Sequence, residues 1–266
     1  MNLYDGILYF ITYSFLGWCC ESMYCSIGTW KWINRGFLNG PFCPIYGFGA
    51  IITLLVLQDV PKHFLTVFLA GMLFTSILEY ITGWGMEKIF HTRWWDYSKK
   101  QFNIHGRICL LNSTLFGLLC VTLYFDLHPI VQSFYGLFSL EFKQGFLAAF
   151  GIYFLSDLLL SVWSAFGLKL RLQKLDQLKN ELLNKYPTLI SNLSFQQILK
   201  QMNNTGIQNK LADKLQQEKS DIGLFERRLL KAFPELSSER YGAFLDELKG
   251  SLNIKKQKID TDLFDE

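Results

Sequence analysis

The chain has 266 residues, of which 50% are hydrophobic and 18% are charged, whereas an ordinary soluble protein has about 25% charged residues. The net charge of +3 is too small to indicate nucleic acid as a partner. Residues 1–167 hold nine of the 26 Lys and Arg and nine of the 23 Asp and Glu. This uneven charge predicts a transmembrane domain over 1–167 and a soluble tail over 168–266.

Five apolar windows in the first domain predict membrane-spanning helices. Each approaches the roughly 20 mostly apolar residues that a helix needs to cross a bilayer. The windows are 4–27, 41–60, 64–84, 107–127 and 144–167. We therefore expect an all-α, polytopic membrane protein with about five transmembrane helices and a C-terminal helical tail.

The segment 34–49, NRGFLNGPFCPIYGFG, is dense in glycine and proline. Such a composition is incompatible with a regular helix throughout. Non-helical backbone at membrane depth survives only where it is buried in protein or lines water, and broken helices often frame transporter sites. The alternative is a plain loop that leads into the second span, with Pro41 near its first turn.

The segment 91–113, HTRWWDYSKKQFNIHGRICLLNS, places polar and aromatic residues between two apolar windows. Trp94, Trp95 and Tyr97 are aromatic residues of the kind enriched at membrane interfaces, and the neighbouring Arg and Lys suit lipid phosphates. Two interpretations fit this pattern equally well. The segment is either an interfacial anchor or the lid and wall of a working site.

The tail has apolar stripes at helical spacing. Leu168, Leu172, Leu175, Leu178 and Leu182 continue the fifth span, and further stripes run over 222–233 and 236–252. Residues 188–219 show no strong period. We expect two or three short amphipathic helices, which form either a solvated bundle beneath the membrane or a surface for a partner.

The distribution of Lys and Arg between the spans predicts the orientation. The segments 28–40 and 85–107 carry seven of these charges, and the tail begins with three more, whereas Lys62 and Lys143 stand alone on the other side. We expect the N-terminus outside and the tail in the cytoplasm.

Ionisable residues inside the predicted spans are the strongest sign of function. A charge at the centre of a membrane helix costs roughly 2.5–3.5 kcal/mol on insertion scales, and such residues usually mark functional sites. Polar groups from four spans lie at a similar, cytoplasmic depth, which predicts a polar cavity open to the cytoplasm. The alternative is a structural polar network. The candidate residues are Glu21, Arg35, Asn39, Glu79, Glu87, Arg93, Asp96, Asn103, Arg107, Asn112 and Asp157.

Four stretches resemble a known family: SFLGWCCESMYCS, NRGFLNGPFCPIYGFGA, LEYITGWGMEKIFHTRWWDYS and FNIHGRICLLNS. They are similar to the type IV ABC-transporter permease family of bacteria, also labelled CmpB-like, over about residues 4–170. The resemblance implies a transport subunit in a bacterial cell membrane. The resemblance does not indicate which substrate is transported.

Motifs for catalysis are missing from this sequence. It contains no GxxxxGK[ST], HExxH or GxSxG pattern, and no cofactor or metal is predicted. Three functions remain open: a transport subunit; an intramembrane enzyme or binding protein for an anionic lipid or lipid-linked substrate; and a non-catalytic scaffold or regulator. The partners expected are membrane lipids, a separate ATPase subunit and, in a homo-oligomer, further copies of the chain.

Overall fold

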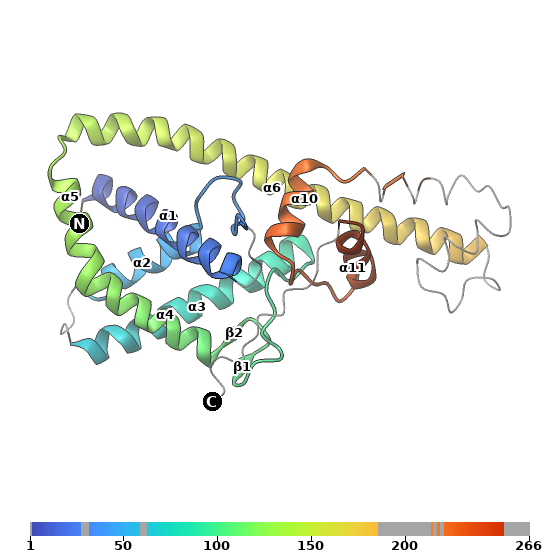
Figure 1. Cartoon of the computed structure of the whole chain (residues 1–266), viewed down its shortest axis with the longest axis horizontal. Helices are drawn as coiled ribbons and strands as arrows, with labels where there is room; N and C mark the ends of the chain where they lie inside the picture. The colour runs from blue at the N-terminus through green and yellow to red at the C-terminus, as the bar shows by residue number, and fades with distance from the viewer. Residues whose placement is uncertain are drawn as a thin grey trace.

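A computed structural model describes residues 2–27, 32–58, 63–185, 214, 217–218 and 221–252. Over these ranges the chain is almost entirely helical, which confirms the all-α expectation (Figure 1). The elements are α1 Leu3–Ile27, α2 Pro44–Val56, α3 Phe64–Phe90, β1 Asn103–Ile104, β2 Ile108–Cys109, α4 Leu110–Thr122, the π-helix η1 Leu123–Leu127, α5 His128–Gly136, α6 Leu140–Lys185, α10 Leu224–Ala232 and α11 Gly242–Ser251. Lys31 and Lys62, which enter the prediction of orientation, and residues 188–213, in which no strong period was found, lie outside the described residues.

Three helical stretches among the described residues are long and apolar enough to cross a membrane: Phe64–Phe90, Leu110–Gly136 and Leu140–Glu181. Each is at least about 40 Å long at 1.5 Å per residue, against a hydrocarbon core of about 30 Å. The second of them joins α4, η1 and α5 into one rod. The π-helix lies directly before Pro129, whose ring would clash with the carbonyl one turn earlier in a regular helix.

The first two predicted spans differ from these three. α1 has 25 residues and is long enough to cross, but it carries Asp5 and Glu21. α2 has only 13 residues, Pro44–Val56, so it extends about 20 Å and is shorter than the predicted window 41–60. Residues 36–43 are non-helical, and the helix begins after them, at Pro44. The count of five spans stays a prediction.

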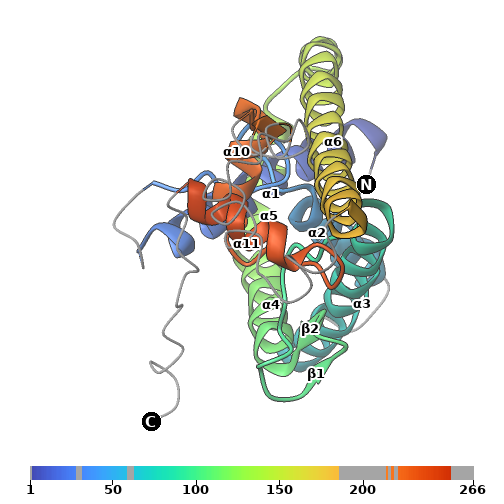
Figure 2. The same ribbon diagram turned by 90° about the vertical axis from the view of Figure 1, so that its right-hand side faces the viewer.

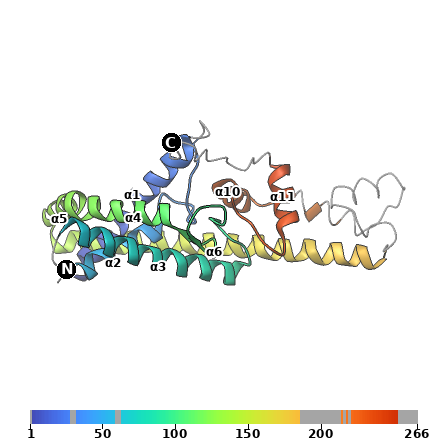
Figure 3. The same cartoon turned by 90° about the horizontal axis from the view of Figure 1, so that it is seen from below.

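α6 is a single helix of 46 residues, Leu140–Lys185. It merges the predicted fifth span with the leucine stripe that follows it, and its length of about 70 Å carries it well past the ends of α1–α4 (Figures 1 and 3). α10 and α11 pack beside this projecting part (Figures 1 and 2). The part of the tail that forms α10 and α11 is therefore docked on α6 in this structure.

The largest hydrophobic core of the described chain lies where the tail meets the helices. It combines the buried leucines of α6 with aromatic residues at the end of α3 and in the loop that follows. Apolar residues of α10 and α11 complete it. Its main members are Phe90, Trp94, Leu168, Leu172, Leu175, Leu229, Leu230, Phe233, Leu236, Tyr241, Phe244, Leu245 and Leu248.

α1 and α2 cross closely because glycine lies at both contact points. A Cβ atom on Gly17 would lie 2.3 Å from Cγ of Tyr46, and a Cβ atom on Gly47 would lie 2.3 Å from Oγ of Ser14. No larger residue fits at either position without moving a helix. This close approach sets the ring of Tyr46 against α1, where it reaches the candidate site.

Candidate functional site

Two acidic residues at the same end of the helical domain each accept a hydrogen bond from a tyrosine. The hydroxyl of Tyr46 donates to Oε1 of Glu21 at 2.7 Å, and the hydroxyl of Tyr97 donates to Oε1 of Glu79 at 3.1 Å. Burial and the carboxylates of Glu79 and Glu21 raise the pKa of the Tyr97 phenol well above its ordinary value, so both carboxylates act on one phenol. We call these four residues the acid–tyrosine cluster.

Glu79 is the most deeply buried acidic residue of this cluster, with a 5% exposed surface. Its Oε1 has the Tyr97 hydroxyl, whereas its Oε2 is buried and has no hydrogen-bond partner among the described residues. One turn earlier on α3, Ser76 donates to Oγ of Ser113 on α4 at 2.7 Å. A buried carboxylate with a free oxygen at a helix interface is costly, which sets Glu79 apart from a packing residue.

Glu87, two turns further along α3, binds both nearby arginines. Nη2 of Arg107 donates to its Oε2 at 2.6 Å, and Nε of Arg93 donates to its Oε1 at 3.0 Å. Arg93 also reaches Glu239 of the tail at 2.9 Å. The sequence does not indicate which of the three glutamates these arginines pair with. In the structure their ion pairs go to Glu87 and to the tail.

Asp157 holds the non-helical loop against α6. Its Oδ1 accepts the backbone N–H of Asn39 at 2.9 Å, and its Oδ2 accepts that of Gly40 at 2.7 Å. The side chain of Asn39 donates to Oγ of Ser161 at 2.9 Å. These bonds satisfy backbone donors that no helix supplies with partners. The residues of the loop from 34 to 43 are buried or half-buried, so its non-helical backbone is at least partly covered by protein.

Arg35 connects the cluster to the tail. Its Nε lies 3.8 Å from Oε2 of Glu21, and its Nη1 donates to the carbonyl of Ala232, the last residue of α10, at 2.6 Å. The guanidinium also stacks over the ring of Phe233 at 4.8 Å. Its charge is therefore shared between Glu21 and the end of a tail helix, where a cation is favourable.

Arg228 of α10 is a structural residue that no motif singles out. It donates to the carbonyls of Leu38 at 2.6 Å and Phe37 at 2.7 Å, both in the non-helical loop. Burial lowers the pKa of this guanidinium. A sequence shows that α10 is amphipathic and basic, but it does not show which carbonyls lack partners 190 residues earlier.

The two tryptophans of the 91–113 segment pack on protein, whereas Phe102 of the same segment is 77% exposed. Trp94 is 3% exposed, with its ring centroid 4.8 Å from Phe233 and 5.3 Å from Phe37. Nε1 of Trp95 donates to the carbonyl of Arg107 at 2.9 Å. The structure thus gives Trp94 a place in the core beneath the tail, and its role as a membrane-interface anchor stays a prediction.

The same segment pairs with the tail through its backbone. Arg93 and Ser237 form an antiparallel bridge in which the two N–H groups donate at 2.7 and 2.9 Å. The tail thus contacts this segment at Arg93, and Tyr97 of the same segment donates to Glu79 of the acid–tyrosine cluster. That the segment acts as the lid and wall of a cavity stays a prediction.

Three further predicted residues, Asp96, Asn103 and Asn112, also lie outside the cluster. Oδ1 of Asp96 accepts the backbone N–H of Ser98 at 3.0 Å. Oδ1 of Asn103 accepts that of Gly106 at 3.1 Å, where φ is +69°. Asp96 and Asn103 therefore shape the turn around β1 and β2. Asn112 lies half-buried in the first turn of α4, beside the Ser76–Ser113 contact.

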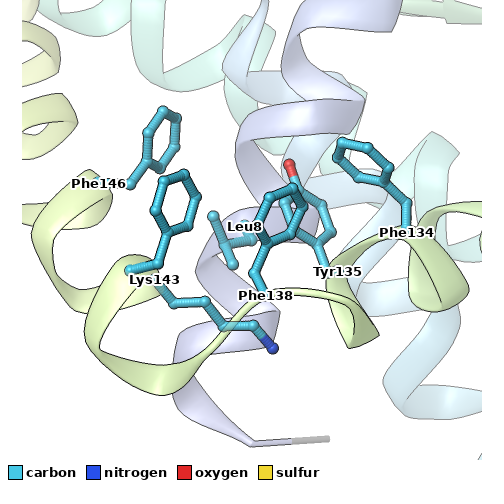
Figure 4. Close-up of a pocket in the computed structure, with 7 residues that line it drawn as sticks. Leu8, Phe134, Tyr135, Phe138, Lys143 and Phe146 are labelled. Carbon is cyan, nitrogen blue, oxygen red and sulfur yellow. The ribbon is translucent and has the colours of Figure 1, made fainter.

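A hollow lies between α1, α5 and α6, near the N-terminal end of α1 (Figure 4). Its volume is about 200 Å³, and its lining is apolar apart from Lys143 and the hydroxyl of Tyr135. Lys143 donates to Oδ1 of Asp5 at 2.8 Å. The lining residues are Leu8, Phe134, Tyr135, Phe138, Phe142, Lys143 and Phe146. Without further polar groups, this hollow is the weaker candidate for recognition or chemistry.

Long apolar helices around a buried polar cluster define the chain as a polytopic helical membrane protein. A family model described as "Putative ABC-transporter type IV" matches residues 8–162, which is more than half of the 266 residues. The chain belongs to this family. The match includes the acid–tyrosine cluster and Asp157 but ends before the tail. Comparison with curated proteins and with solved structures finds no match.

Proposed function

We propose that the chain is the membrane subunit of an ABC-type transporter and that its substrate binds at the acid–tyrosine cluster from the cytoplasmic side. The observation that carries this proposal is Glu79, a buried carboxyl group in a membrane helix, one oxygen of which has no partner among the described residues. Ionisable residues in such positions mark substrate and ion pathways. The other three members come from α1, α2 and the loop after α3, so a change in helix packing would change the site.

The energy for transport would come from a separate ATPase chain. Membership of the family supports this partner, and the present sequence contains no P-loop pattern. The positive-inside bias puts the tail and the 91–113 segment on the cytoplasmic side, where an ATPase would be found. The Arg93–Ser237 bridge joins the two, so a partner that binds at this side would meet both.

The proposal is tested first by purification. The tagged chain, solubilised from its own cells with native lipids, should retain a P-loop ATPase that mass spectrometry identifies and that hydrolyses ATP in the purified complex. A preparation that is folded and monodisperse but never contains an ATPase would contradict the ABC-type assignment.

The role of the cluster is tested in cells. Glu79→Gln should fold, insert and still fail to restore the phenotype of a strain that lacks the gene. Glu141→Gln, at the far end of α6 and exposed, is the matched control and should restore it fully. If Glu79→Gln complements as well as Glu141→Gln, the cluster is not the transport site.

A further inference from the structure

We infer that the ligand of the acid–tyrosine cluster is a small monovalent cation, an alkali-metal ion or an ammonium group, and that Glu79 provides its counter-charge. This inference rests on the proposed function, because it names the substrate class of the same site. Two independent observations carry it: the balance of charges around the cluster, and the unpartnered oxygen of Glu79.

Among the described residues, the cluster holds more carboxyl groups than cations. Glu21 and Glu79 contribute two carboxyl groups, and Arg35 forms an ion pair with one of them, Glu21. Arg35 lies 3.8 Å from Glu21, and its Nη1 is held by a carbonyl of the tail. It therefore compensates Glu21 only in part and leaves Glu79 without an ion pair among the described residues.

The other two arginines near the cluster each form an ion pair with Glu87, although Nε of Arg107 has no hydrogen-bond partner among the described residues. Glu87 accepts Arg107 on one oxygen and Arg93 on the other, at 2.6 and 3.0 Å. Glu87 lies eight residues beyond Glu79 on α3, about 12 Å along the helix axis. Moving either arginine to Glu79 would leave part of Glu87 without a partner, which is costly at a half-buried site. An anionic headgroup would meet two carboxylates here, so the charges disfavour an anionic lipid as the ligand.

The side-chain oxygens of the acid–tyrosine cluster are hard ligands, and those of Glu79 and Tyr97 are in contact with each other. Oε2 of Glu79 is buried and has no hydrogen-bond partner among the described residues. The phenol oxygens of Tyr97 and Tyr46 donate their protons to carboxylates, so their lone pairs are available to a positive group. Carboxylate and hydroxyl oxygens suit hard cations and ammonium groups, whereas softer metals prefer imidazole and thiolate ligands.

Thermal unfolding of the purified full-length chain in detergent with native lipids tests the inference. The probes are NaCl, KCl and methylammonium chloride, each compared with N-methyl-D-glucamine chloride at equal ionic strength and pH. A ligand that binds only the folded protein raises Tm in a saturable way. We expect at least one small cation to do so, and the one with the lowest half-saturation concentration distinguishes metal ion from ammonium.

Two variants assign the effect to the cluster. Glu79→Gln should lose the cation-dependent rise in Tm, and Glu141→Gln should keep it. Tyr97→Phe retains the carboxylate but removes one oxygen and should raise the half-saturation concentration about tenfold or more, as expected for the loss of a hydrogen bond to a charged group. If Glu79→Gln cannot be purified as a folded protein, the half-saturation concentration of Tyr97→Phe alone tests whether the cation binds at the cluster.

The outcomes separate this inference from the proposed function. If no cation shifts Tm of the wild-type chain, or if Glu79→Gln keeps the shift, the cation assignment is wrong, even where Glu79→Gln fails to complement in cells. If the shift depends on Glu79 but Glu79→Gln complements normally, the cation site stands and the transport role of the cluster is wrong.

Discussion

Arg228 in tail helix α10 donates a 2.6 Å hydrogen bond to the carbonyl of Leu38, which lies in the non-helical loop before α2. From the other side of the same loop, Asp157 of α6 accepts the N–H groups of Asn39 and Gly40. The guanidinium of Arg228 thus donates to a carbonyl of the loop, and the carboxylate of Asp157 accepts N–H groups of the same loop. The loop needs the tail as well as the membrane helices to satisfy its backbone groups, although the family match ends before the tail.

Replacing Arg228 should therefore destabilise the membrane domain as well as the tail. Arg228→Met keeps the apolar length of the side chain but leaves the loop carbonyls without a donor, which costs about 1–3 kcal/mol for a buried group. We expect a lower Tm and faster proteolysis within residues 34–43. Lys231→Met removes an exposed cation of the same helix and should change neither. Equal behaviour of the two variants would mean that the tail does not support the loop.

Trp94 and Trp163 give opposite expectations for the same substitution. Trp94→Ala removes a side chain that is 3% exposed and should cost about 3–5 kcal/mol, with release of the tail to added protease. Trp163 on α6 is 70% exposed, so Trp163→Ala should leave Tm in detergent within a few degrees of wild type. If Trp94→Ala is as mild as Trp163→Ala, then Trp94 is an interface anchor and the core around it is loose.

Glycine substitutions test the crossing that positions Tyr46. Gly17→Ala places a methyl group about 2.3 Å from the ring of Tyr46, and such overpacking costs about 1–3 kcal/mol. Gly151→Ala, in α6 with nothing within 4 Å, should instead stabilise its helix by up to about 1 kcal/mol. The measurement is Tm for both variants. A stabilised Gly17→Ala protein would show that α1 and α2 are less closely packed than described.

A double-mutant cycle locates the partner of Arg107. Glu87→Gln and Arg107→Gln should each lower the free energy of unfolding, and the double variant should lose less than their sum, with a coupling of roughly 0.5–3 kcal/mol. The cycle of Glu79 with Arg107 should be closer to additive, since the 2.6 Å ion pair of Arg107 goes to Glu87. Stronger coupling to Glu79 would contradict the assignment of both arginines to Glu87.

Labelling of introduced cysteines tests the orientation. Gln58 follows α2 and Ser98 follows α3, and both are exposed. In intact cells a membrane-impermeant thiol reagent should modify Gln58→Cys above the background of the parent chain and should leave Ser98→Cys unmodified until the cells are broken. The reverse pattern would place the acid–tyrosine cluster and the tail outside.

The sequence predicts those features that depend on neighbouring residues. Long apolar runs lead to α3, the α4–α5 rod and α6, and the rule that buried charge is costly leads to Glu21 and Glu79. The sequence does not show that Tyr46 and Tyr97 bind these carboxylates. Apolar windows do not indicate which helices pack together, and the contact between Tyr46 and α1 at Gly17 depends on that packing. The sequence likewise predicts that Asp157 is a polar group of the cavity, but it does not show that this carboxylate accepts the N–H groups of the loop backbone.

The docking of the tail is the least predictable part of the fold. The stripe over 222–233 indicates a helix with one apolar face, and many surfaces would cover such a face equally well. The contacts that select one surface join residues far apart in the sequence, as Arg35 and Ala232 show. Only their arrangement in space distinguishes a docked tail from a solvated bundle.

The unbroken length of α6 has a mechanical consequence. The helix contacts the loop at Asp157 and packs against the tail at Leu172 and Leu178. It is continuous from Leu140 to Lys185. A continuous helix behaves as a stiff lever, and Leu178 lies about 30 Å beyond Asp157. A tilt of about 5° at Asp157 thus displaces the tail's anchoring point by about 3 Å, so small rearrangements among the membrane helices are magnified at the far end.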